Sequence, residues 1–71
     1  MAKIRLFMCD RVTDDIINME VELPADIVDI LRGRGSIDDY NTAYATATLK
    51  GNQILRERYH VKDDWFLDNW D

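Results

Sequence analysis

Hydrophobic residues alternate with other residues in two segments near the N-terminus, residues 3–9 and 16–23. A period of two is typical of β-strands that bury one face. The polar segment DRVTDD, residues 10–15, lies between them and has the length of a hairpin loop. We therefore expect an N-terminal antiparallel β-hairpin with one hydrophobic face. The residues expected on that face are Ile4, Leu6, Met8, Ile17, Met19, Val21 and Leu23.

Charged residues in the two segments support one register of this hairpin. The register that gathers the hydrophobic residues on one face pairs residue 8 with residue 17 and continues along both strands. It also places Arg5 opposite Glu20 and Lys3 opposite Glu22. Opposite charges that face each other across two strands stabilise the pairing by roughly 0.2–1 kcal/mol each. We therefore expect these two ion pairs on the polar face.

The next segment, residues 24–33, predicts a short helix. Pro24 suits the first turn because its missing N–H would be unpaired there, and Asp26 favours the positive end of the helix dipole. Gly33 and Gly35 supply the left-handed conformation that ends a helix. The hydrophobic positions at helical spacing are Ile27, Val28, Ile30 and Leu31.

A longer helix is expected from about residue 36 to residue 59. The Ser36 side chain is suited to cap it, with Asp38 and Asp39 in the first turn. A second hairpin, with TATL and ILRERYHV as strands and KGNQ as the turn, is the alternative for residues 42–61, and threonines in this segment support it. The alanines of the segment and its lack of proline favour the helix.

The chain ends in KDDWFLDNWD, which combines large hydrophobic side chains with several aspartates. Asp63 or Asp64 is suited to cap a short final helix, in which Phe66 and Trp70 would lie one turn apart on one face. Asp68 falls near the unfavourable end of such a helix, so we expect its last turn to need a surface to pack on.

Together these elements predict an α+β fold of the ββαα type in one domain, residues 1–71. It consists of an N-terminal antiparallel β-hairpin, a short helix, a long helix and a short C-terminal aromatic helix. A chain this short buries only about 60% of its unfolded surface, so its core is small. With Cys9 and His60 as the only cysteine and histidine, neither an internal disulfide nor a structural zinc site is expected. Close packing or a partner, for example in a homodimer, must then supply stability.

Composition narrows the functional classes. The net charge is −5, and the acidic residues concentrate in the hairpin and the tail. Nucleic-acid binding needs a stripe of basic residues, which the sequence lacks, so direct binding of nucleic acid is not expected. Neither a membrane-spanning run nor a signal peptide is recognisable, which makes a cytoplasmic location the simplest interpretation.

Motifs for catalysis are weak. GRGS, residues 33–36, lacks the following lysine of a phosphate-binding loop and precedes two early acids. Cys9 has no neighbouring basic residue in the sequence that would activate it as a nucleophile with His60. Adjacent aspartates at a helix start are more typical of caps than of acid–base pairs. We expect a non-enzymatic protein without a metal or cofactor.

Residues 17–49, INMEVELPADIVDILRGRGSIDDYNTAYATATL, resemble the ribbon-helix-helix DNA-binding domains in the order of their strand, proline-started helix, glycine turn and serine-capped helix. The resemblance implies a dimeric DNA-binding regulator or antitoxin whose paired strands read base edges. The readout positions would be Asn18, Glu20 and Glu22, and two of these are acids that phosphates repel. The family also lacks a strand equivalent to residues 3–9.

Acidic and aromatic residues of the loop and tail suggest a binding role. Acids steer a complex toward a basic surface, and tryptophan is a favoured anchor at interfaces. The hypothesis is a small acidic protein that occludes the basic surface of a nucleic-acid-handling protein. Phage and mobile-element inhibitors of host defence, including anti-CRISPR proteins, are often of this kind. The candidate partner-binding residues are Asp14, Asp15, Asp63, Asp64, Trp65, Asp68 and Trp70.

Overall fold

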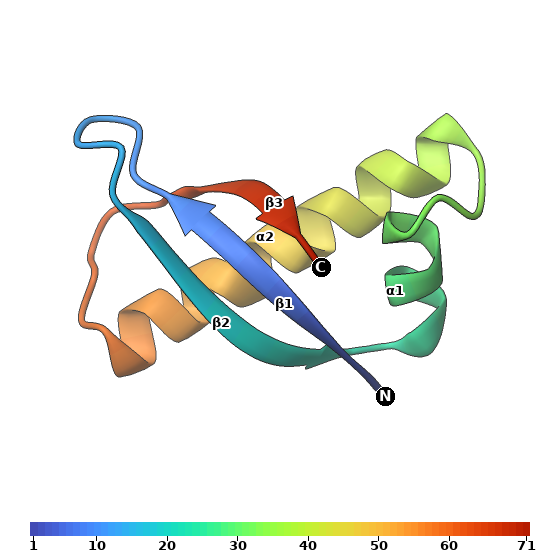
Figure 1. The fold of residues 1–71 in the computed structure, drawn as a ribbon, viewed down its shortest axis with the longest axis horizontal. Coiled ribbons are helices and arrows are strands. Elements are labelled where there is room, and N and C mark those ends of the chain that lie inside the picture. The colour runs from blue at the N-terminus through green and yellow to red at the C-terminus, as the bar shows by residue number, and fades with distance from the viewer.

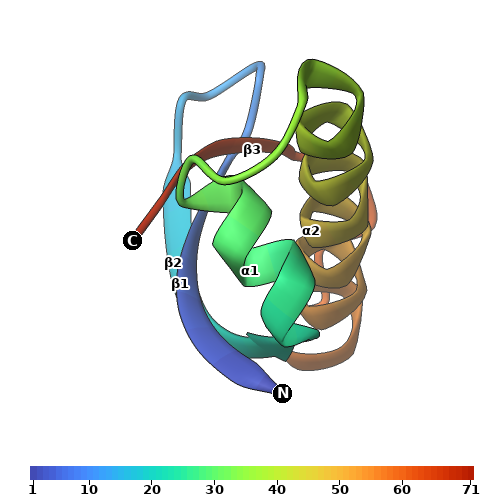
Figure 2. The same cartoon turned by 90° about the vertical axis from the view of Figure 1, so that its right-hand side faces the viewer.

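The computed structural model describes residues 1–71 and has an α+β fold. Three strands form one antiparallel sheet in the order β2-β1-β3, and two helices pack on one of its faces (Figures 1 and 2). The elements in chain order are β1 (Ala2–Cys9), β2 (Ile16–Leu23), α1 (Ala25–Leu31), α2 (Ile37–Arg58) and β3 (Phe66–Trp70).

The N-terminal hairpin has the predicted register. Met8 lies opposite Ile17, and the pairing continues without a shift to Ala2 opposite Leu23. The expected direct ion pairs are wrong in detail, however. Lys3 instead reaches diagonally to Glu20, with 3.9 Å between Nζ and Oε1, and Arg5 Nη1 donates a 2.7 Å hydrogen bond to Asn18 Oδ1. Because these long side chains are exposed, they can contact diagonal neighbours as readily as directly opposite ones.

Both predicted helices form. Pro24 is the N-cap of α1 rather than its first helical residue, and Gly33 and Gly35 have φ values of 101° and 124° in the turn that follows the helix. Ser36 caps α2 and forms a capping box with Asp39, because each side chain bonds the other residue's backbone N–H. The long helix is therefore confirmed, and the alternative hairpin over residues 42–61 is wrong.

The predicted C-terminal helix is wrong, because the tail forms β3 along the free edge of β1 (Figure 1). Met8 lies opposite Leu67, but Phe7 lies opposite Asn69, so Asp68 is the extra residue of a β-bulge. The bulge changes the spacing of inward residues from two to three. Seen in the sequence alone, that irregular spacing resembles the three-to-four spacing of a helix.

The core lies between the sheet and the helices. α2 approaches β1 closely at Gly51, where an added Cβ would lie 2.5 Å from the Met8 sulfur. Small residues on the inner side of α2 thus allow the long helix to lie against the sheet. The buried core consists of Ile4, Leu6, Met8, Met19, Val21, Leu23, Val28, Leu31, Ala43, Ala47, Ile54, Leu55, Trp65 and Leu67. Neither helix has the length and apolar character that crossing a bilayer requires.

Candidate functional site: the helix-free face of the sheet

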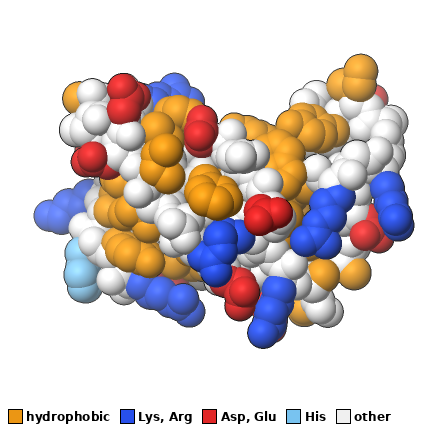
Figure 3. Space-filling model, in the orientation of Figure 1, with side chains coloured by type: hydrophobic (Ala, Val, Ile, Leu, Met, Phe, Trp, Pro, Cys, Tyr) orange, Lys and Arg blue, Asp and Glu red, His pale blue; other side chains and the backbone are white.

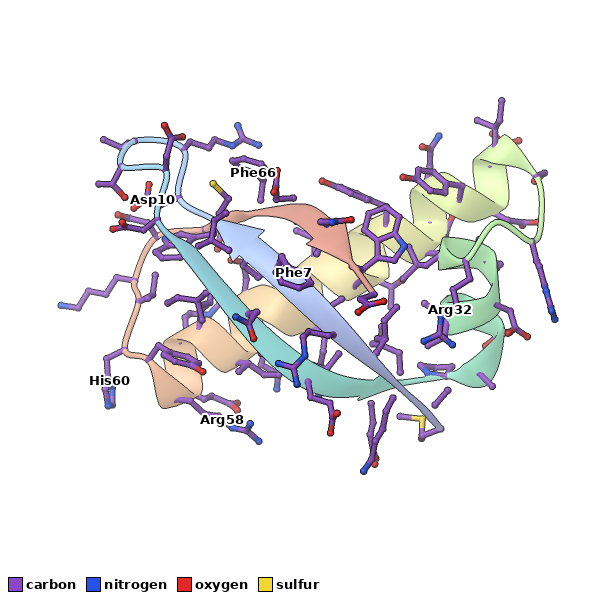
Figure 4. The ribbon with its side chains drawn as sticks, viewed as in Figure 1. Phe7, Asp10, Arg32, Arg58, His60 and Phe66 are labelled. Carbon is purple, nitrogen blue, oxygen red and sulfur yellow. The ribbon has the colours of Figure 1, made fainter.

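One face of the sheet is left uncovered by the helices (Figures 1 and 2). Residues that lie opposite one another in paired strands project to the same face, so Phe66 of β3 joins Cys9 of β1 and Ile16 of β2 there. Phe7 lies on the same face near the middle of β1, and Phe66 lies toward the hairpin loop (Figure 4).

Hydrophobic side chains therefore occur on a face that the strand periodicity predicts to be polar. Ile16 is 53% exposed, Phe7 and Phe66 are half-buried, and Cys9 is buried beneath its neighbours. The space-filling view of this face shows hydrophobic side chains interspersed with acidic and basic ones (Figure 3). A mixture of exposed hydrophobic and charged side chains is typical of surfaces that bind another protein transiently.

Carboxylates gather around one end of this face. Burial raises the pKa of the Cys9 thiol, and the charges of Asp14, Asp68, Asp10 and Asp15 raise it further. These charges act on the thiol because the hairpin loop and the bulge of β3 bring them near it. We call Asp10, Asp14, Asp15 and Asp68 the acidic end.

The carboxylates of the acidic end form no ion pairs within the chain. The two ion pairs of the structure join Lys3 to Glu20 and Arg56 to Asp64. Asp10 Oδ1 instead accepts a 2.8 Å hydrogen bond from the Val12 backbone N–H, which shapes the loop. No direct ion pair within the chain therefore offsets the charges of the acidic end.

Arg11 is the basic residue closest to this arrangement. Its guanidinium lies over the Phe66 ring, 5.6 Å from the ring centroid, and connects the hairpin loop to β3. Arg11, Asp14, Tyr44 and Phe66 line an open hollow at this edge of the molecule. The loop and the tail thus meet at one place on the surface.

The other predicted acids lie elsewhere. Asp63 and Asp64 belong to the segment between α2 and β3, and neither is among the carboxylates that raise the pKa of Cys9. Asp64 Oδ1 is paired with Arg56 Nη1 at 3.0 Å, which offsets its charge locally. The structure therefore brings together Asp14, Asp15 and Asp68, whereas Asp64 lines a neighbouring hollow with Arg11 and Phe66 and is paired with Arg56.

The two tryptophans attach the tail to the helices. Trp65 is only 9% exposed, and the buried Asn52 side chain bonds both its backbone N–H and its C=O, at 2.8 and 3.0 Å. Trp70 is half-buried, and its Nε1–H donates a 2.8 Å hydrogen bond to the Leu31 carbonyl. The Trp70 ring also lies 6.0 Å from the Tyr44 ring. Neither tryptophan projects from the helix-free face, where the accessible aromatic rings are those of phenylalanines.

Sequence reasoning missed Phe7, Ile16 and Phe66 as surface residues. A signal was present for the first two, because each is a large hydrophobic residue at a position that the period of two assigns to the polar face. No such signal existed for Phe66, since its orientation depends on the pairing of β3 with β1.

Comparison of the chain with protein-family models, with curated proteins and with solved structures found no match. The ribbon-helix-helix resemblance covers β2, α1 and the first part of α2. In this chain, however, β2 pairs with β1 of the same chain, and β3 extends the sheet further. No group of three or more histidine, cysteine, aspartate or glutamate side chains is arranged to hold a metal ion.

Proposed function

We propose that the protein is a non-enzymatic binding module that docks its helix-free sheet face on the basic surface of another protein and thereby blocks it. The observation that carries this proposal is the acidic end, where four carboxylates without ion pairs adjoin the exposed Ile16 and the half-buried Phe66. Unpaired acids supply long-range attraction to a basic partner, and the neighbouring hydrophobic side chains supply contact area once the surfaces meet.

A nucleic-acid-handling protein is the proposed class of partner. Such proteins carry basic surfaces that bind phosphates, and an acidic protein competes for them by placing its carboxylates against the same basic groups. Small size and net negative charge are the properties that this chain shares with phage and mobile-element inhibitors, so we place it among anti-defence proteins of the anti-CRISPR kind. This assignment rests on analogy of class.

The experiment that tests the proposal begins with capture of partners from a nuclease-treated bacterial lysate on the immobilised protein. The captured partner is then purified, and its Kd is measured by calorimetry for the wild type and for the triple variant Asp14→Asn, Asp15→Asn, Asp68→Asn. Loss of three exposed charge contacts is expected to weaken binding about tenfold or more. It also reduces the dependence of Kd on salt, because fewer charges take part.

A matched control is the triple variant Asp26→Asn, Asp29→Asn, Asp38→Asn, which changes the net charge equally at exposed positions on the helices. It is expected to bind like the wild type, because its changes lie outside the proposed interface. Equal weakening by both triple variants means that net charge alone governs binding and contradicts the proposal. Retention of duplex DNA from an untreated lysate, with no protein partner, favours a DNA-binding regulator instead.

A further inference from the structure

The edge strands β2 and β3 differ in whether hydrogen-bond partners cover their outward N–H and C=O groups. On the β3 edge, side chains of α2 cover the outward groups: Asn52 bonds the N–H and C=O of Trp65, and the Tyr44 hydroxyl donates to the Leu67 carbonyl. Edge strands are commonly protected in such ways because unpaired backbone groups attract other strands. The β3 edge is thus covered at Trp65 and Leu67.

The β2 edge has no such cover. Arg5 exchanges both backbone hydrogen bonds with Asp71, so the odd-numbered residues of β1 face β3 and the even-numbered ones face β2. The even-numbered residues of β1 pair with the odd-numbered residues of β2. The backbone N–H and C=O groups of the even-numbered residues of β2 therefore point away from the sheet. These are Ile16, Asn18, Glu20 and Glu22.

This open edge is long and regular. β2 has eight residues, which corresponds to about 26 Å of strand. Its register with β1 is free of bulges and the strand contains no proline, so the charges of Glu20 and Glu22 are the one usual device against edge pairing that β2 carries. The edge is therefore geometrically ready to accept another strand.

Side chains of both charge signs lie around this edge. On the helix-free face, Glu20 and Glu22 are exposed, and the contact of Glu20 with Lys3 is a long one of 3.9 Å between two exposed side chains. A hollow beside β2 extends from this edge to α2, and both basic and acidic residues line it together with the hydrophobic Val21 and Ile54; the charged ones are Lys3, Glu20, Glu22, Lys50, Glu57 and Arg58. An added strand would therefore place alternate side chains against Glu20 and Glu22 on the helix-free face and against Val21 and Ile54 on the helix side.

We infer that the β2 edge binds an extended segment of another protein in which basic residues alternate with hydrophobic ones. Backbone hydrogen bonds to β2 would hold the segment, its basic residues would face Glu20 and Glu22, and its hydrophobic residues would face the hollow beside Val21. A second copy of this chain fits less well, because antiparallel pairing of two β2 strands would bring Glu20 and Glu22 of both copies together. The two surfaces adjoin at Ile16, but this inference rests on the backbone groups of β2 and not on the acidic end.

The test uses the intact protein and a nine-residue peptide in which lysine alternates with valine. Exchange of backbone amide hydrogens is followed residue by residue by NMR, because binding at this edge protects a specific set of N–H groups. At a peptide concentration that occupies most of the protein molecules, exchange is expected to slow about tenfold or more at the amides of Asn18, Glu20 and Glu22. The amides of Met19 and Val21, which already bond β1, serve as internal references.

Two controls separate this mode from simple charge attraction. A peptide of the same composition with its lysines and valines in blocks is expected to give no such slowing, because its charges fall on both faces. The variant Glu20→Lys, Glu22→Lys is expected to prefer a peptide that alternates glutamate with valine. Equal slowing by the alternating and blocked peptides, or no slowing by either, overturns the inference. Slowing that rises with protein concentration without peptide overturns it in favour of self-pairing of β2.

Discussion

Asn52→Ala is the substitution that most directly tests how the tail is held. Asn52 is buried, with 5% of its surface exposed, and its side chain makes both hydrogen bonds to the Trp65 backbone. Alanine leaves that N–H and C=O without partners at a buried position. Each such group costs about 1–3 kcal/mol, and part of that cost is recovered where water enters. The loss for two groups is therefore about 2–4 kcal/mol.

Helix propensity acts in the opposite direction. Alanine is favoured over asparagine within a helix by roughly 0.5 kcal/mol, which reduces the net loss to about 1.5–3.5 kcal/mol. For a domain of this size each kcal/mol shifts Tm by roughly 4–8 °C, so a decrease of roughly 6–28 °C is expected. That loss is a large fraction of the stability of a small domain, about 5 kcal/mol at the lower end of the usual range.

The assay is urea unfolding at equilibrium, followed by tryptophan fluorescence and by far-ultraviolet circular dichroism. Both tryptophans lie in the tail, so fluorescence reports its detachment, whereas dichroism reports mainly the helices. The control is Gln53→Ala, which removes an exposed side chain that bonds Glu57 at 3.2 Å and is expected to change stability by less than about 0.5 kcal/mol. A loss for Asn52→Ala as small as that of the control would refute the role of Asn52 in holding β3.

Three further predictions concern single contacts. Tyr44→Phe removes the hydroxyl that bonds the Leu67 carbonyl and is expected to lower the free energy of unfolding by about 1 kcal/mol, measured by urea unfolding. Gly51→Ala places a methyl group against the Met8 sulfur and is expected to lower the free energy of unfolding by about 1–3 kcal/mol. Met8→Ala makes room for that methyl group, so the Gly51 substitution is expected to lower the free energy of unfolding less in the Met8→Ala background. The rate of Cys9 alkylation against pH is expected to give an apparent pKa above the ordinary thiol value, because burial and the acidic end disfavour the thiolate. Converting the aspartates of the acidic end to asparagine should lower that pKa, and an unchanged profile would mean that burial alone sets it.

The hairpin and the helices were predictable because their signals are local. Alternation within residues 3–9 and 16–23 determines which face is buried, and a one-residue slip in register would expose that face. The capping box of Ser36 and the glycines before it likewise act within a few residues of the helix start. Such short-range preferences can be read without knowing the rest of the fold.

The tail could not be predicted in the same way because its conformation depends on a distant partner. β3 pairs with β1, which lies at the other end of the chain, and hydrogen bonds to β1 outweigh a weak local preference for helix. The bulge at Asp68 concealed the strand further by breaking its alternation. The acidic end was partly foreseeable, because Asp10, Asp14 and Asp15 lie in the predicted hairpin loop, but the placement of Asp68 and Phe66 beside that loop depends on the pairing of β3 with β1.

β3 packs against the helices with one set of side chains and contributes another set to the helix-free face of the sheet. Trp65, Leu67 and Trp70 lie toward the helices, where Asn52 and the Leu31 carbonyl hold them. Phe66 projects to the helix-free face, and the bulge residue Asp68 adds its charge to that of the hairpin loop. If the acidic end binds a partner, weakening the attachment of β3 should weaken binding even though Asn52 lies outside the interface. The tryptophans of the tail thus hold β3 against the helices, and β3 in turn positions Asp68 at the acidic end.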